Sequence, residues 1–481
     1  MLLCIAVFAC VFVFFYCMHP LVILDSDDWK YVSFARPAVP SPTFWNPSRI
    51  LPELLMPLCG SMALVLFRIG ALGYIESQML VFAICAAAFI TAYTAMFSQL
   101  LNRRFGLHKA QSALLAGLFL ILHFLIFRTA DSGNLHLFWS YDVCCFFYYT
   151  IPAVLNCTLV MYFMSSDILE SFFSSERIFC KAFLTLVLYL AVFSNLFGSV
   201  ILAVYIALCI LKKIIRKEKQ SAAHIIILAA WVVAVVLESL GGRAAGSESA
   251  ELDAAGAFAA FGADFKAISI FFAAVCMLCI VSALVVCLAE KHMEKEFKDI
   301  LIGITADGII VSLAEIILCA KVSAAYMLRP QVFFGTAFFM LLFSLSCAAY
   351  AISRCRQIFI AVPVLAVLAL TLTNTQSVTF AENNTMNLPW QQCIQIDNDI
   401  INQAVNADRA GLDSFRLEMM DTGWDDNWPH TSYMANNTFK QTLLKHGLIN
   451  RDIEIIPVWS RDFNDRNGIM IENFSQWRHY E

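Results

Sequence analysis

Apolar segments long enough to cross a lipid bilayer recur along this chain, and they constrain its fold more than any other feature. Examples lie at 77–101, 142–164, 267–290 and 332–353. A helix needs about 17–25 apolar residues to cross the hydrocarbon core. Only 14% of the residues are charged and 60% are hydrophobic, whereas soluble domains have about 25% charged residues. We therefore predict a polytopic α-helical membrane protein.

Clusters of Lys and Arg indicate how the chain is threaded through the membrane. They lie at 103–109, 177–181, 212–219, 291–298 and 354–356, and such clusters in short loops mark the cytoplasmic side. An even number of spans must separate neighbouring clusters. We predict about 11 spans, with the N-terminus in the cytoplasm and the C-terminal domain outside.

Two segments need a special arrangement under this threading. Residues 182–211 begin and end at cytoplasmic clusters, so we predict two short spans that meet near Asn195. Residues 49–72 have both flanks outside and contain Pro57 and Gly60, so we predict a re-entrant or interfacial helical hairpin. The alternative, a plain crossing at 49–72, would invert the first span.

The balance of charge divides the chain into two domains. Residues 375–481 contain 15 acidic and 8 basic residues, for a net charge near −7, whereas residues 1–374 are near +2. We predict a membrane domain at 1–374 and a small extracytoplasmic α/β domain at 375–481. Its expected elements are helices at 397–410 and 432–446 and strands at 414–420 and 453–459. Neither domain has a basic face suited to nucleic acid.

Cysteine placement favours a bacterial cell membrane. Only Cys393 of the 17 cysteines lies in residues 375–481, so this domain forms no internal disulfide. Small secreted domains commonly depend on disulfides. The pattern is more typical of a bacterial surface protein.

Three aspartates follow the first apolar segment directly: Asp25, Asp27 and Asp28. Clustered carboxylates repel one another, which raises a carboxyl pKa or attracts a cation. Either result suits a general base or a ligand of a divalent metal, and the sequence leaves the need for a metal open. One aspartate can face the site while another caps a short interfacial helix. We favour Asp28 as the base; the alternative is a solvated loop beside aromatic anchors.

The other outer loops carry cations and aromatic residues near the ends of the spans, where few cations are expected. Arg binds phosphate through two parallel hydrogen bonds, so these loops predict one shared anion site. The alternative is that each cation is structural or faces lipid headgroups. The candidate substrate-binding residues are Arg36, Arg49, Arg128, Trp139, Glu238, Arg243, Lys321, Tyr326 and Arg329.

Two carboxylates lie inside a predicted span at 299–321. Asp307 and Glu315 are eight residues apart and therefore share one helix face. Acidic residues within a membrane span are functional candidates by default. They fit either a proton relay or ion pairs with neighbouring spans, and we favour the ion pairs. His123, in another span, is expected to be a hydrogen-bonded structural residue.

These features together resemble the GT-C superfamily of membrane glycosyltransferases. Asp25-Ser26-Asp27-Asp28-Trp29 is similar to the acidic motif in the first outer loop of that superfamily. The C-terminal domain looks like that of bacterial surface-polysaccharide or serotype-modifying members. The motifs that carry this second likeness are Asp425-Asp426-Asn427-Trp428-Pro429 and Leu444-Lys445-His446-Gly447.

The resemblance implies a reaction. A sugar would move from a polyprenyl-phosphate donor to a glycan or other acceptor at the outer face of the membrane. An aspartate of the first loop would deprotonate the acceptor hydroxyl, and Arg or Lys would stabilise the departing phosphate. The alternative function is a secondary transporter or flippase of a polar or lipid-linked substrate that uses Asp307 and Glu315.

Overall fold

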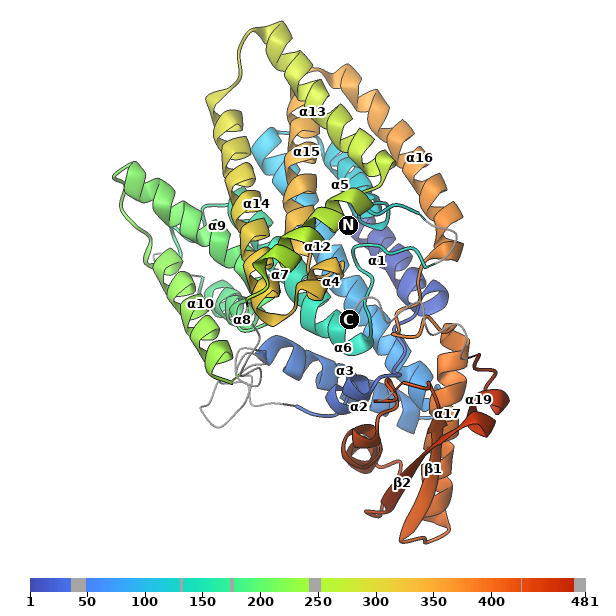
Figure 1. The fold of residues 1–481 in the computed structure, drawn as a ribbon. Coiled ribbons are helices and arrows are strands. Elements are labelled where there is room, and N and C mark those ends of the chain that lie inside the picture. Colours follow the sequence, from blue (N-terminus) through green and yellow to red (C-terminus); the bar gives the residue numbers. More distant parts are fainter. Residues whose placement is uncertain (36–48, 130–132, 174–176, 242–251, 425, 471–481) are drawn as a thin grey trace.

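A computed structural model describes residues 1–35, 49–129, 133–173, 177–241, 252–424 and 426–470 of the chain. Long helices form a bundle, and a small α/β unit is attached at one end (Figure 1). Among the described residues, nine helices are long and apolar enough to cross a membrane. The predicted helical fold with many apolar helices of spanning length is confirmed, and these helices suggest a multi-pass membrane protein.

The nine candidate spans are α3 (Ile50–Arg68), α4 (Tyr74–Phe105), α6 to α7 (Val143–Ser165), α9 (Leu196–Ile215), α10 (Ala222–Gly241), α13 (Ile270–Glu290), α14 (Lys295–Val322), α15 (Phe334–Arg354) and α16 with its flanking turns (Arg356–Thr379). All except α3 coincide with predicted spans, which the apolar pattern places at 77–101, 142–164, 182–211, 223–240, 267–290, 299–321, 332–353 and 357–374. The other predicted spans correspond to shorter apolar helices, namely α1 with its π-helical extension (Leu2–Met18), α5 (Lys109–Phe124) and α8 (Ile178–Val192). The total of about 11 spans therefore remains a prediction.

The predicted break near Asn195 is confirmed. Helix α8 ends at Val192, and α9 begins at Leu196. The Asn195 side chain caps α9 by accepting a hydrogen bond from the Phe197 amide at 2.9 Å. Gly198 then allows α9 to approach α7 (Ile151–Ser165), because a Cβ at Gly198 would lie 2.8 Å from the Pro152 Cβ.

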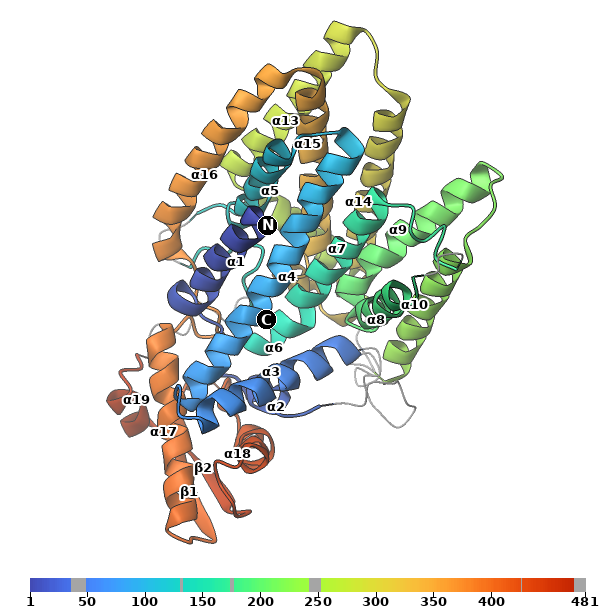
Figure 2. The same ribbon diagram turned by 180° about the vertical axis from the view of Figure 1, so that it is seen from behind.

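The predicted hairpin at 49–72 is wrong, because this segment forms the single helix α3, which continues through Pro57. Gly60 is not a turn: a Cβ there would collide with the Val32 carbonyl oxygen, so the glycine serves close packing. At the start of α3, Leu51 donates its amide to the Phe193 carbonyl, and at its end Arg68 donates to the His446 carbonyl at 3.2 Å. Figure 2 shows α3 lying across the bundle at the end that bears the α/β unit. Because α3 is also long and apolar enough to cross a membrane, the interfacial placement and the plain crossing both remain predictions.

Ion pairs join the predicted cytoplasmic segments at the opposite end of the molecule. Arg104 pairs with Asp167 and Glu296, Lys213 with Glu170, Arg216 with Asp299, and Arg354 with Glu294. In Figure 1 the turns joining α13 to α14 and α15 to α16 lie at the top of the view, and the α/β unit lies at the bottom. The charge pattern therefore grouped these loops correctly, while the side of the membrane that they face remains a prediction.

The C-terminal unit has the elements that the sequence predicts. They are α17 (Trp390–Arg409), β1 (Ser414–Met420), the π-helical turn η6 (Met434–Phe439) continuing into α18 (Lys440–His446), and β2 (Glu454–Ser460). A further short helix, α19 (Arg461–Arg466), was not predicted. The two strands pair in parallel, with Ser414 opposite Glu454. Helix α17 packs against β1, and the buried side chains of Ile400 and Leu417 belong to the common core.

Candidate functional site

The acidic motif of the first loop folds into a short helix, α2 (Ser26–Tyr31). Asp25 precedes its first residue, and Asp28 lies three positions further on, so the two form a capping box at the start of the helix. The expectation that one aspartate caps a short helix is therefore met by this pair. Together with Asp27 and Asp142 they form a group that we call the acidic cluster.

Asp28 is fully buried, and its carboxylate accepts three backbone hydrogen bonds. The donors are the amides of Leu24 at 3.2 Å, Asp25 at 3.3 Å and Cys144 at 2.6 Å. Burial raises the pKa of Asp28 well above its ordinary value, and the charge of Asp142 raises it further, while the amide donors oppose both effects. These three hydrogen bonds give Asp28 a structural role in stabilising the first outer loop.

Asp25 is buried beside Asp28 and is held by the C-terminal region. Its Oδ2 accepts a hydrogen bond from the Thr385 hydroxyl at 2.8 Å. Its Oδ1 has no hydrogen-bond partner within the described part of the chain. Burial raises the pKa of Asp25 well above its ordinary value, and the nearby charges of Asp142 and Asp28 add to this.

Asp142 is a fourth member of the cluster that sequence analysis did not select. It caps the short helix α6 (Val143–Cys145) by accepting a hydrogen bond from the Cys145 amide. Burial raises its pKa to about 6; the charge of Asp27 also raises it, whereas that of Arg329 lowers it. The available signal was an Asp directly before an apolar run, which is typical of a helix N-cap.

Asp27 differs from the other members of the cluster because its carboxylate forms no structural contact among the described residues. It is only half-buried, in the first turn of α2. In the described ranges, no group donates a hydrogen bond to its side chain and no cation pairs with it. Its charge acts on both Asp25 and Asp142, so it lies close to the buried acids while its oxygens stay available.

Arg329 supplies a cation beside the acidic cluster. It follows the short 3-10 helix η3 (Ala324–Leu328), and its side chain is mostly buried. The guanidinium carbon lies 4.2 Å from the centre of the Tyr326 ring and 5.0 Å from that of Tyr141. The Nε of Arg329 has no hydrogen-bond partner among the described residues. Two rings thus hold the planar cation with one donor still unused.

The other predicted substrate-binding residues do not join this group through ion pairs. Arg49 instead pairs with Glu238 at 2.5 Å, and the Trp139 indole donates to the Glu382 carbonyl at 2.9 Å. The exposed side chain of Arg128 donates to the Ile268 carbonyl at 3.2 Å. Lys321 is exposed near the end of α14, and Arg36 and Arg243 lie outside the described residues. The site that can be described therefore retains Arg329 and Tyr326 from the predicted anion site.

The C-terminal unit covers α2 and completes the surroundings of the cluster. The Ser26 hydroxyl donates to the Pro429 carbonyl at 2.8 Å, and the Ser33 and Thr442 hydroxyls are 2.7 Å apart. Thr385, the partner of Asp25, is 360 positions away from it in the chain. Sequence reasoning had no local signal for these contacts, because tertiary folding alone brings the segments together.

The aspartates of the acidic cluster were also candidate ligands of a divalent metal. Among the described residues, no three His, Cys, Asp or Glu side chains are arranged to hold a metal ion.

The intramembrane acids are not paired as expected. Glu315 accepts a hydrogen bond from the Thr336 hydroxyl at 2.6 Å, and no cation pairs with Asp307 or Glu315 within the described ranges. His123, in contrast, is hydrogen-bonded as predicted, to the Tyr93 hydroxyl at 3.0 Å and the Phe119 carbonyl at 2.7 Å.

No protein-family model and no curated protein matches this chain. The fold and the site alone therefore define its class. It is a mostly helical protein with nine described helices long and apolar enough to cross a membrane, and with an acidic cluster, largely buried, where the bundle meets a small α/β unit.

Proposed function

We propose that this chain is a membrane glycosyltransferase of the GT-C type, located in a bacterial cell membrane, that uses a polyprenyl-phosphate sugar as donor. The acceptor is a glycan or another hydroxyl compound on the extracytoplasmic side. The observation that supports this best is that Asp27, an available carboxylate, and Arg329, a cation held by two rings, both act on the buried Asp142. Such a pair supplies a base and an electrostatic partner for a leaving phosphate.

We assign the role of general base to Asp27 rather than to Asp28. A base must reach the proton that it removes, and three backbone amides hold the carboxylate of Asp28 inside the fold. Asp27 takes the proton of the acceptor hydroxyl as that oxygen attacks the anomeric carbon. The bond from this carbon to the phosphate oxygen breaks, and the configuration at the carbon is inverted.

Arg329 stabilises the negative charge that develops on the departing phosphate. An arginine can bind two phosphate oxygens at once, and its unused Nε donor suits this role. Because Tyr326 and Tyr141 hold the guanidinium plane, little reorganisation is needed when the charge appears.

The test is consumption of donor by membranes that contain the full-length protein. Wild-type protein should consume a polyprenyl-phosphate sugar, and Asp27→Asn should lower turnover by roughly 10²–10⁴, the usual contribution of a general base. Equal rates in wild type and Asp27→Asn would remove the catalytic role of Asp27. Absence of consumption with a panel of polyprenyl-phosphate hexoses would overturn the proposed function itself.

The transporter alternative rests on the observation that, among the described residues, no cation pairs with Asp307 or Glu315. The two carboxylates differ in their surroundings, however. Asp307 lines a cavity whose lining residues do not include Glu315, and Glu315 is buried against Thr336. This separation does not favour a continuous relay, so the glycosyltransferase is the function that we propose.

A further inference from the structure

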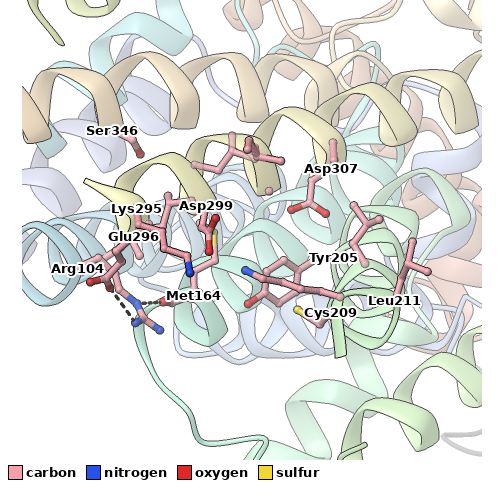
Figure 3. Close-up of a pocket in the computed structure, with 18 of the residues that line it drawn as sticks. Arg104, Met164, Tyr205, Cys209, Leu211, Lys295, Glu296, Asp299, Asp307 and Ser346 are labelled. Atoms are coloured by element: carbon pink, nitrogen blue, oxygen red, sulfur yellow. Dashed lines mark hydrogen bonds and ion pairs between the residues drawn. The ribbon is translucent and has the colours of Figure 1, made fainter. Parts of the chain in front are cut away.

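A cavity of about 810 Å³ lies at the end of the bundle opposite the acidic cluster. Residues of α4, α9, α14 and α15 line it. Figure 3 shows Asp307 and Tyr205 at one end of this cavity and Arg104, Glu296 and Lys295 at the other. The glycosyltransferase proposal does not use it.

The charges of the cavity are only partly neutralised by one another. Arg104 pairs with Glu296 at 4.0 Å, and Arg216 pairs with Asp299 at 2.9 Å. Lys212 and Lys295 also line the cavity, and neither forms an ion pair with any residue that the structure describes. Two cations therefore remain available to a ligand at the end where the helices terminate.

The deeper end of the cavity offers a buried hydrogen-bond acceptor. Asp307 is 4% exposed, and its Oδ1 has no hydrogen-bond partner among the described residues. A buried carboxylate without a partner is costly, so a ligand that donates hydrogen bonds would relieve it. Cys209, Lys212 and Asp307 all line this one cavity.

The side wall of the cavity is apolar and open. Leu211, Ile215 and Ile302 line it and are all exposed. They belong to α9 and α14, two of the candidate spans, so their exposed surfaces suit hydrocarbon chains. The cavity thus combines an apolar wall, two lysines without ion pairs among the described residues and a buried carboxyl group. This combination suits an amphiphile with hydrocarbon chains, an anionic group and a hydrogen-bond donor.

We propose that this cavity binds a membrane lipid whose headgroup carries a phosphate and a primary ammonium, as phosphatidylethanolamine does. The ammonium donates to Asp307, the phosphate lies between Lys212 and Lys295, and the acyl chains follow Leu211 and Ile302. An anionic lipid without an amine would leave Asp307 unpaired. A quaternary amine has no N–H to donate. The assignment is independent of the proposed glycosyltransferase activity.

Binding of short-chain lipids to the purified full-length protein in detergent tests this assignment. Native mass spectrometry or calorimetry would compare dihexanoyl phosphatidylethanolamine with the corresponding phosphatidylglycerol and phosphatidylcholine. Wild type should bind the ethanolamine lipid at least about 10-fold more tightly, because charge-assisted hydrogen bonds to Asp307 are formed only by that headgroup. Equal affinity for the three lipids would overturn the proposal.

Two matched pairs of variants locate the site. Asp307→Asn should weaken binding of the ethanolamine lipid about 10-fold, whereas Glu315→Gln removes a carboxylate from the same helix outside this cavity and should not. Lys295→Gln should weaken binding of both phosphatidylethanolamine and phosphatidylglycerol, and Lys298→Gln, which does not line the cavity, should weaken neither. Equal effects within either pair would contradict the assigned contacts.

Soluble O-phosphoethanolamine distinguishes a lipid from a free metabolite with the same charges. It should compete at least about 10-fold more weakly than the lipid, because it lacks the chains that contact the apolar wall. Competition with the affinity of the lipid would overturn the assignment to a membrane lipid.

Discussion

The carboxylate of Asp28 accepts a hydrogen bond at 2.6 Å from the backbone amide of Cys144, a residue 116 positions further along the chain. This bond ties α2 to α6 and thereby joins two loops at this end of the molecule. Asp142 caps α6 two residues earlier, so the two buried acids are brought together by the helix that both of them hold. The buried carboxylates of Asp28 and Asp142 therefore stabilise the two short helices that position Asp27.

The first prediction separates support from catalysis within the acidic cluster. Asp28→Asn should destabilise the protein by about 1–3 kcal/mol, because the amide NH₂ group would be buried where backbone donors now point. Asp27→Asn should leave stability within about 0.5 kcal/mol of wild type and still lose turnover. Thermal unfolding in detergent and donor consumption would be measured on the same preparations.

The opposite result would indicate that Asp28, and not Asp27, is the general base. If Asp28→Asn unfolds at the wild-type temperature and is inactive, while Asp27→Asn is active, the capping role assigned to Asp28 is wrong. Asp462→Asn, at an exposed position of α19, serves as a control for the substitution itself.

The second prediction concerns Arg329. Arg329→Gln should weaken donor binding by about 10- to 150-fold, corresponding to the loss of a charge-assisted bond worth roughly 1.5–3 kcal/mol. Arg128→Gln is the matched control, because Arg128 is exposed and bonds only a backbone carbonyl among the described groups. Titration with a polyprenyl-phosphate sugar would report the affinities. Equal donor affinities in Arg329→Gln and Arg128→Gln would show that Arg329 does not bind the donor phosphate.

Much of the membrane architecture was predictable because bilayer thickness sets the length of a span. The break at Asn195 and the strand Ser414–Met420 were also found from local signals. Pro57 and Gly60 misled the prediction of a hairpin, since a glycine can serve close packing as well as a turn. Sequence alone cannot tell these two uses apart without the neighbouring helix.

The candidate site was only partly predictable for a related reason. The three closely spaced aspartates were visible as a cluster, but the separate roles of Asp25 and Asp28 depend on partners that are distant in the chain, namely Thr385 and Cys144. Likewise, the sequence offered Arg49 as a cation for the anion site, but in the fold Arg49 forms an ion pair with Glu238. Local pattern indicates which groups are present, whereas tertiary contacts decide which of them remain available.

The third prediction tests the packing of the C-terminal unit on the first outer loop. The Ser33 and Thr442 hydroxyl oxygens are 2.7 Å apart, which brings their Cβ atoms within the range that a disulfide bridges. Ser33→Cys combined with Thr442→Cys should form a cross-link on mild oxidation, detected by peptide mass spectrometry. Ser33→Cys combined with Thr431→Cys is the control, because Thr431 contacts Ser26 instead. Cross-linking of the control pair alone would contradict this packing.

The last prediction follows from the pKa of Asp142, which burial raises from 3.8 to about 6. A folded state that holds a proton more tightly than the unfolded state gains stability at low pH and loses it as pH rises through the folded pKa. The protein should therefore lose stability between about pH 4 and 6 through this group, by up to roughly 3 kcal/mol for a shift of two units.

Asp142→Asn isolates that contribution, because Asn keeps an oxygen to cap α6 and cannot ionise. The unfolding temperature of the variant, relative to wild type, should rise from pH 5 to pH 8, since only the wild type acquires a buried charge over this range. Asp462→Asn replaces an exposed acid and should show no such rise. A difference between Asp142→Asn and wild type that stays constant from pH 5 to pH 8 would show that Asp142 does not titrate in this range in the folded protein. The raised pKa would then have to be abandoned, together with the view that Arg329 only partly offsets the burial of this acid.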